Sequence, residues 1–281
     1  MSQRVTTRRR QLGAVLRKFR VRAGMTLEEA GRRVDVSKAT VSRYETQSGP
    51  VKWVVVDALC REYGTSDAER EAVVSLAKEA KKQGWWSSFG DAIPESMNLL
   101  LTLEDEAVRQ DHFCSVYVPG LLQTRGYATS LQQANERRRS REDIERLVDI
   151  RMKRQQILDR PNPPHVWAVF DESVIRRVVG SPSVTEEQLD RLLTFDGSPQ
   201  VTLQVLPFSR GAHCAALGSF VVIGGTEPSL DVAYVDLHVG SVFLEKEEEL
   251  ERYRLAFDYL RAQALDIDAS MAMVKRAREE L

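Results

Sequence analysis

Apolar positions in the first third of the chain recur at the spacing of α-helices. Leu12, Leu16 and Phe19 stand at i, i+4 and i+7, which places them on one face of a first helix. Gly24 follows as a stop signal, because glycine adopts the left-handed conformation at a helix end without a steric cost. The pattern predicts an amphipathic helix that packs against other helices.

Two short helices are predicted next, separated by a turn of about three residues. Thr26 and Glu29 have the spacing of a capping box, and Ser37 is placed to cap the helix after the turn. In that later helix Val41 and Tyr44 stand at i and i+3, so both side chains face the core. Two helices joined this closely are typical of a helix-turn-helix motif.

The outward face of the second of these helices carries small, polar and basic side chains. They are Lys38, Ala39, Ser42 and Arg43. Lysine and arginine donate hydrogen bonds to guanine in the major groove, and small residues let a helix approach the bases closely. We therefore expect this helix to read double-stranded DNA.

Two further helices complete a predicted all-α bundle over residues 1–83. One spans 51–63. The other opens with a second capping box, Ser66 with Glu69, and runs to about Gln83. Five helices of this length are enough for one compact DNA-binding domain.

The charge distribution supports DNA binding, although the formal net charge is only −1. Residues 1–46 contain twelve lysine and arginine residues against four acidic ones, so their charge is +8 and the remaining chain is −9. A basic field of this kind supplies the salt-dependent part of DNA affinity. Arg9 and Arg10, in a run with no acidic neighbour, are the predicted phosphate contacts. A charge run alone is more often a solvated face, so the assignment depends on the adjacent motif.

A predicted junction at 84–93 separates this bundle from a second domain over 94–281. Trp85 and Trp86 lie in the junction between glycines. Such a pair is a hinge that docks one domain on the other, a lid over a ligand or, most commonly, packed core. The residues that follow are numerous enough to form an independent core.

Helical and strand-like segments alternate in the second domain. Strands are predicted at 107–117, 165–170, 201–206, 219–223, 231–236 and 239–244. Helices are predicted at 95–104, 124–135, 140–160, 172–179, up to 196 from a capping box of Thr185 with Gln188, and near 269–281. The whole chain is therefore predicted to be α+β: an all-α helix-turn-helix bundle followed by helices around a mostly antiparallel sheet.

A helical stripe near the end of the chain has two interpretations. Leu250, Tyr253, Phe257 and Leu260 follow one another at spacings of three and four residues. The stripe serves as ordinary core or as a dimer interface, and the first is the commoner case. A homodimer on an inverted-repeat operator is expected in either case, because one recognition helix reads only a few base pairs.

Two clusters of reactive side chains are better explained by structure than by catalysis or metal binding. Asp171, Glu172 and Arg176 fit the start of a helix followed by an i,i+4 ion pair. A zinc site would have to be assembled from four scattered residues without a metal-binding spacing: His112, Cys114, His213 and Cys214. No phosphate loop, nucleophile elbow or dinucleotide turn is present. We predict no enzyme activity, no metal and no cofactor.

The helix-turn-helix resembles the xenobiotic-response-element (XRE) type of regulator over residues 12–63. The run Val-Ser-Lys-Ala-Thr-Val-Ser-Arg-Tyr-Glu (36–45) matches the recognition-helix signature of that family. The resemblance implies base contacts by Lys38, Ala39 and Arg43, with Thr40 and Ser42 nearer the DNA backbone. Two positions depart from the family: Leu27 replaces a glutamine that contacts phosphate, and Asp35 replaces a glycine in the turn.

The second domain resembles a large group of antitoxin-like XRE regulators from filamentous soil bacteria. Four phrases carry the resemblance, in order: Val-Pro-Gly-Leu-Leu-Gln-Thr-Arg-Gly-Tyr-Ala (118–128), Arg-Met-Lys-Arg-Gln-Gln-Ile-Leu (151–158), Asp-Glu-Ser-Val-Ile-Arg-Arg-Val-Val-Gly (171–180) and Val-Leu-Pro-Phe-Ser-Arg-Gly-Ala-His (205–213). In that group the gene typically neighbours one for a small partner protein. The resemblance implies a regulator of transcription whose C-terminal domain binds such a protein.

An alternative role for the second domain is sensing of a small molecule. The walls of such a pocket would include Trp85, Trp86, Trp167 and Phe208. Three cysteines without a disulfide framework, no signal peptide and no membrane-spanning apolar run predict a protein of the reducing cytoplasm.

Overall fold

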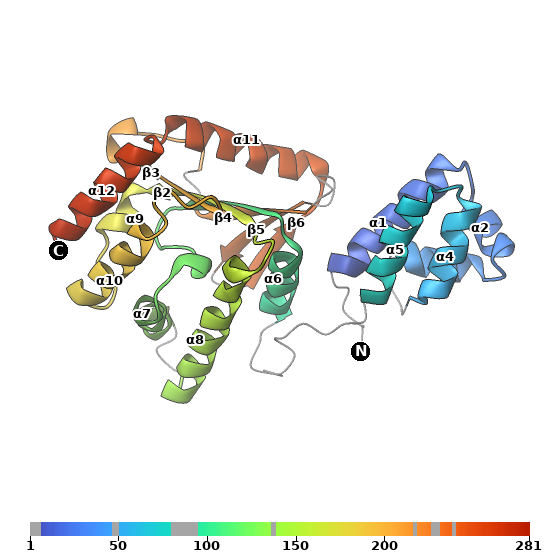
Figure 1. The fold of residues 1–281 in the computed structure, drawn as a ribbon, viewed down its shortest axis with the longest axis horizontal. Helices are drawn as coiled ribbons and strands as arrows, with labels where there is room; N and C mark the ends of the chain where they lie inside the picture. The colour runs from blue at the N-terminus through green and yellow to red at the C-terminus, as the bar shows by residue number, and fades with distance from the viewer. Residues whose placement is uncertain are drawn as a thin grey trace. The chain divides into compact units, whose positions relative to one another are not determined.

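The chain folds into two compact units, Met1–Ser88 and Phe89–Leu281. The structure is a computed structural model that describes residues 7–46, 51–79, 95–135, 139–215, 218–225, 231–237 and 240–281. The first unit is helical and the second contains a sheet, as Figure 1 shows. The predicted junction at 84–93 lies outside the described residues.

The first unit contains the five predicted helices. They are α1 (Thr7–Arg22), α2 (Leu27–Arg33), α3 (Lys38–Thr46), α4 (Trp53–Glu62) and α5 (Asp67–Glu79). One core contains the predicted apolar positions Leu12, Leu16, Phe19, Val41 and Tyr44, together with Val56 and Leu59 of α4. Both predicted capping boxes are formed, Thr26 with Glu29 and Ser66 with Glu69. Gly24 has a φ of +67°, as expected of a helix terminator.

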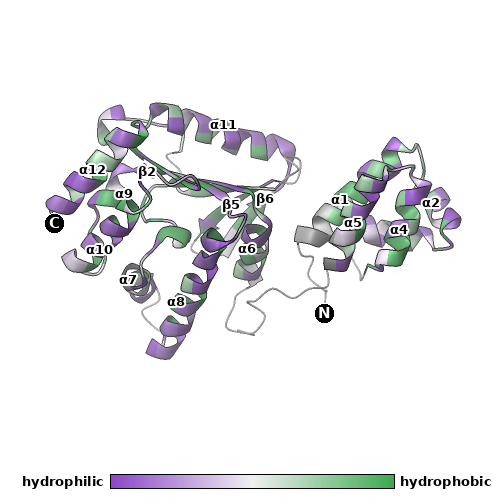
Figure 2. Cartoon of the chain, viewed as in Figure 1, coloured by the Kyte–Doolittle hydropathy of each residue, from purple (hydrophilic) through white to green (hydrophobic). Residues whose placement is uncertain are grey.

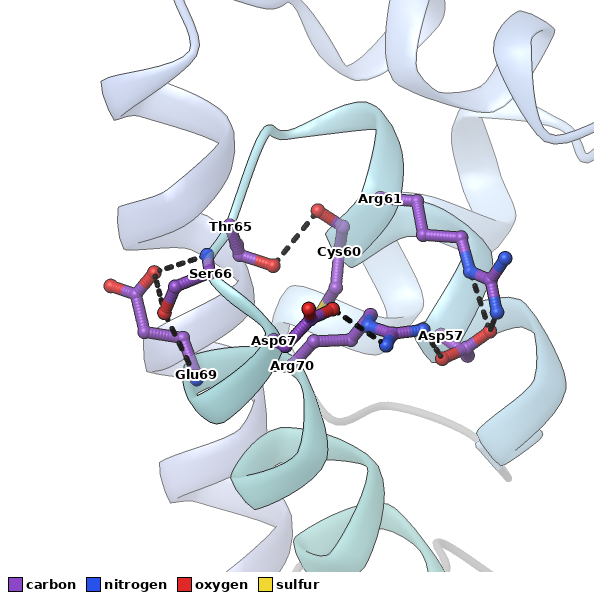
Figure 3. A network of polar contacts seen from close by, with 8 residues as sticks. All are labelled: Asp57, Cys60, Arg61, Thr65, Ser66, Asp67, Glu69 and Arg70. Atoms are coloured by element: carbon purple, nitrogen blue, oxygen red, sulfur yellow. Dashed lines mark hydrogen bonds and ion pairs between the residues drawn. The ribbon is translucent and has the colours of Figure 1, made fainter.

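A polar network joins α4 to α5 in the same unit. Figure 3 shows the guanidinium of Arg70 between Asp57 of α4 and Asp67 of α5, with Arg61 also donating to Asp57. Thr65, in the turn between the helices, donates to the carbonyl of Cys60. These contacts orient two helices whose apolar faces already share the core.

The second unit has a six-stranded sheet of order β3-β2-β1-β4-β5-β6. Its strands are β1 (Arg109–Cys114), β2 (His165–Asp171), β3 (Val201–Leu206), β4 (Phe220–Gly224), β5 (Val232–Leu237) and β6 (Gly240–Leu244). Its helices are α6 (Glu95–Glu106), α7 (Arg125–Asn135), α8 (Arg141–Gln155), α9 (Glu172–Arg176), α10 (Pro182–Leu193), α11 (Glu247–Gln263) and α12 (Ile267–Glu279), with single 3₁₀ turns at Gly120–Leu122, Gln156–Asp159 and Phe208–Arg210.

The sheet is mixed, so the prediction of a mostly antiparallel sheet is wrong. β1, β2 and β3 are parallel to one another, whereas β4, β5 and β6 run antiparallel to their neighbours. Parallel neighbours need long crossover connections, and here each crossover contains helices: α7 and α8 after β1, α9 and α10 after β2. The alternation of helices and strands in the sequence was the signal for parallel pairing.

The start of α10 also differs from the prediction. Ser181, not Thr185, caps this helix through a hydrogen bond from the amide of Val184. Gln188 is fully buried and bridges the amide of Thr124 to the carbonyl of Leu122. The capping-box spacing of Thr185 and Gln188 is therefore coincidental, because both side chains form hydrogen bonds with backbone groups outside the helix start.

Helices cover both faces of the sheet (Figure 1). α11 packs on one face through Leu250, Phe257 and Leu260, which are buried against strand residues such as Phe113. This stripe is core within one chain, so it cannot serve as the dimer interface. The opposite face is covered by α6 near β4 and β5, and by α10 and α12 near β3.

Hydrophilic residues dominate α8, whereas α4 is largely hydrophobic, as Figure 2 shows. The polar character of α8 continues into the interior of the second unit. Arg154 of α8 pairs with Glu104 of α6, and their side chains are 10% and 2% exposed. On the neighbouring strand His112 is buried and its Nε2 lies 3.1 Å from the Oε1 of Gln110.

Gly31 holds α2 close to the turn that leads into α3. A Cβ at this position would lie 2.6 Å from the carbonyl oxygen of Val36. We expect Gly31→Ala to destabilise the first unit by about 1–3 kcal/mol, because the turn must move and alanine's better helix propensity offsets only part of that cost. Gly64→Ala is the control: it has open space and carries only the strain of its φ of +65°. Denaturant unfolding in which Gly31→Ala matched the wild-type stability would contradict this close approach.

His112 makes the stability of the second unit depend on pH. Burial, together with the nearby charge of Arg154, lowers the pKa of His112 to about 3. In the unfolded chain its pKa is near its ordinary value of about 6.5, so the unfolded state binds the extra proton between these values. Stability is therefore expected to fall as pH falls below about 6.5, and His112→Gln should flatten this slope. Urea midpoints at pH 7 and pH 5 that shifted equally in both proteins would exclude His112 as the cause.

Candidate nucleic-acid interface

The turn between α2 and α3 fixes where the recognition helix begins. Asp35 adopts a φ of +54°, so it fills the left-handed position at which the XRE-type regulators that this segment resembles have glycine. Ser37 then caps α3, because its Oγ accepts a hydrogen bond from the amide of Thr40 over 3.1 Å. Local sequence therefore sets both ends of the turn.

A buried ion pair fixes the other end of α3. Arg20 of α1 donates from Nε to Oε1 of Glu45 over 2.6 Å and from Nη2 to Oε2 over 2.9 Å. Its Nη1 donates to the carbonyl of Met25, in the loop before α2. The hydrogen bonds to Glu45 raise the pKa of Arg20 above its ordinary value. Arg20 is one of the twelve basic residues within residues 1–46, but its guanidinium binds within the fold.

The rest of α3 presents the predicted reading face. Val41 and Tyr44 are 1% and 4% exposed and lie in the core. Lys38, Ala39 and Arg43 are exposed, and Thr40 and Ser42 are partly exposed. The five residues predicted to contact DNA from this helix thus lie on its accessible side.

Thr40 has a contact that the sequence did not reveal. Arg43 donates from Nη2 to the Oγ1 of Thr40 over 3.0 Å, and this oxygen lies 2.9 Å from the Oγ of Ser37. The i,i+3 spacing of these residues was the available signal. The hydroxyl of Thr40 therefore contacts a predicted base-reading side chain.

Three other positions of the first unit have contacts within the fold. Leu27 packs against the core of the first unit, so its position has an apolar role. Arg22 and Arg33 are paired with Glu69 and Glu62, respectively. Arg9 and Arg10 belong to α1, but their side chains lie outside the described part of the chain.

The two described residues of the predicted ligand pocket, Trp167 and Phe208, are not brought together. Trp167 donates to Gln204 and lies under the guanidinium of Arg261, so it has a packing role. Phe208 follows the far end of β3, whereas Trp167 pairs with Thr202 near its beginning. Thr202 and the last strand residue before Phe208, Leu206, are four positions apart, which corresponds to about 13 Å along the strand. Trp85 and Trp86 lie outside the described residues.

A surface depression lies elsewhere, in the first unit. It has a volume of about 400 Å³ and is lined by Trp53, Asp57, Arg61, Arg70, Glu71, Val74, Ser75 and Lys78. The residues of the network in Figure 3 form part of its wall. Lys78 covers the ring of Trp53, with its Nζ 4.5 Å from the centroid. Neither Trp167 nor Phe208 contributes to it.

The reactive clusters have structural contacts. Asp171 caps α9 through the amide of Ser173, and Glu172 pairs with Arg176 as predicted. Glu172 also accepts a hydrogen bond from the amide of Phe208. Cys114 is buried and Cys214 is exposed, and the described residues contain no group of three or more potential metal ligands.

Comparisons with known proteins match both units. A model of a helix-turn-helix domain matches residues 11–73, and a model of a domain of unknown function, DUF5753, matches residues 97–276. No curated protein and no solved structure matched the chain. Within the described ranges no helix has the length and apolar character needed to cross a membrane. The first match supports DNA binding and transcription regulation. The second spans more than half of the chain, which therefore belongs to the DUF5753 family and carries a helix-turn-helix domain ahead of that family's defining domain.

Proposed function

We propose that this protein is a sequence-specific, DNA-binding transcriptional regulator of the antitoxin-like XRE type. The observation that carries the proposal is the face of α3, where Lys38, Ala39 and Arg43 are exposed on a helix held at both ends. Side chains of this kind match the donor and acceptor pattern of the major groove. The protein acts by binding, without catalysis.

The second unit is proposed to bind a small partner protein and to hold a homodimer on an inverted-repeat operator. Four sequence phrases shared with the antitoxin-like regulators support the protein partner. The net charge of −9 after residue 46 favours encounter with a partner that has a basic face. Trp167 and Phe208 lie apart, so these two residues do not support the small-molecule alternative.

Arg43 tests the recognition face. Arg43→Ala should remove base contacts and weaken binding to a selected operator by about 1–3 kcal/mol, with a smaller effect on random DNA. Arg9→Ala or Arg10→Ala should weaken binding to all sequences and reduce its salt dependence. The comparison uses affinities for the operator and for a random duplex at several salt concentrations. An unchanged operator preference in Arg43→Ala would place the recognition face elsewhere.

Fragments test the division of labour between the two units. Residues 1–83 contain the complete helical bundle and should fold and bind DNA weakly, with strong salt dependence. A fragment from Gly90 onward should bind no DNA, scatter light as a dimer, and capture the protein encoded by a short reading frame beside this gene. Tight binding of that protein to residues 1–83 would refute the assignment of partner binding to the second unit.

A further inference from the structure

The recognition helix contains a short chain of hydrogen-bonding side chains on its exposed surface. The Oγ of Ser37 lies 2.9 Å from the Oγ1 of Thr40, which accepts a hydrogen bond from Nη2 of Arg43 over 3.0 Å. The three residues are spaced by three positions, so they follow one another along successive turns of α3. The cap of the helix is thereby connected to the guanidinium at its centre.

This chain restrains the most mobile member of the reading face. A free arginine side chain samples many rotamers, and part of this rotamer entropy is lost when the side chain binds a base. In the described part of the chain, the guanidinium of Arg43 forms a hydrogen bond with Thr40. A side chain already restrained in the free protein loses less entropy on binding.

The contact leaves Arg43 able to read a base. A guanidinium has five N–H groups, and one of them is used by Thr40. The remaining donors include those needed for a bidentate contact to O6 and N7 of guanine. The hydroxyl of Thr40, by contrast, is already engaged on two sides, by Ser37 and by Arg43.

We propose that Thr40 is a positioning residue, which sets the orientation of Arg43 toward one base pair instead of contacting a DNA phosphate itself. This assignment rests on the proposed function, because it requires Arg43 to read a base. It revises the role that the family resemblance gives to Thr40, and it adds a side chain that determines specificity without touching the bases.

Full-length protein and a selected DNA duplex provide the test. The wild-type protein first enriches binding sequences from a randomised duplex library, and affinities are then measured for the enriched duplex and for a random one. Thr40→Val keeps the β-branched shape but removes the hydroxyl. It should lower the ratio of the two affinities about three- to tenfold, the effect of one hydrogen bond. The loss should concentrate at the base pair whose preference Arg43→Ala relaxes.

Three further variants separate positioning from other roles. Thr40→Ser keeps the hydroxyl and should restore most of the ratio, and Thr46→Val is the matched control, because its hydroxyl donates to the carbonyl of Ser42 instead. The double variant Thr40→Val with Arg43→Ala should lose no more specificity than Arg43→Ala alone. If circular dichroism shows that Thr40→Val does not fold, Thr40→Ala replaces it with a better helix former.

Different failures have different meanings. An unchanged ratio in Thr40→Val, or losses that add in the double variant, would overturn the positioning role. Equal weakening on the enriched and the random duplex would do so as well, because it is the signature of a phosphate contact. If the library yields no enriched sequence, sequence-specific binding itself fails, and the role of Thr40 fails with it.

Discussion

The ion pair between Arg20 and Glu45 is the contact on which the DNA-binding unit depends most. Both side chains are nearly buried, at 13% and 5% exposure, so the pair makes two parallel hydrogen bonds away from competing water. It joins α1 to the C-terminal half of α3, and the bond from Arg20 to Met25 adds the loop before α2. Because Ser37 holds the opposite end of α3, the exposed side of this helix has a defined orientation within the first unit.

Buried polar contacts have a comparable role in the second unit. The buried pair between Glu104 and Arg154 joins α6 to α8. A second, more exposed pair joins Asp105 to Arg160 beyond α8. Removing one partner of such a buried pair would leave an uncompensated charge, so the two helices are positioned more specifically than by apolar packing alone. α6 is the first described element after the junction. These directional contacts, together with apolar packing, fix its place on the sheet.

Local patterns in the sequence predicted most elements and the exposed side of α3, for reasons visible in particular residues. The capping box of Thr26 with Glu29 involves groups three positions apart, and the left-handed Asp35 is a property of one residue. The inward positions of Val41 and Tyr44 follow from helical geometry alone. These features need no information from distant parts of the chain.

Contacts between distant segments could not be predicted in the same way. Arg20 belonged to a basic run and gave no sign that Glu45, twenty-five positions away, would accept its hydrogen bonds. The path of the crossover helices between strands decides three further features. These are the parallel direction of β1, β2 and β3, the separation of Trp167 from Phe208, and the burial of Gln188. The sequence by itself determined the helix-turn-helix, the order of elements and the exposed side of α3, because those follow from spacing over a few residues. Only the tertiary structure decided which charges pair inside the fold and which remain available, because burial and pairing arise when segments far apart in the chain come into contact.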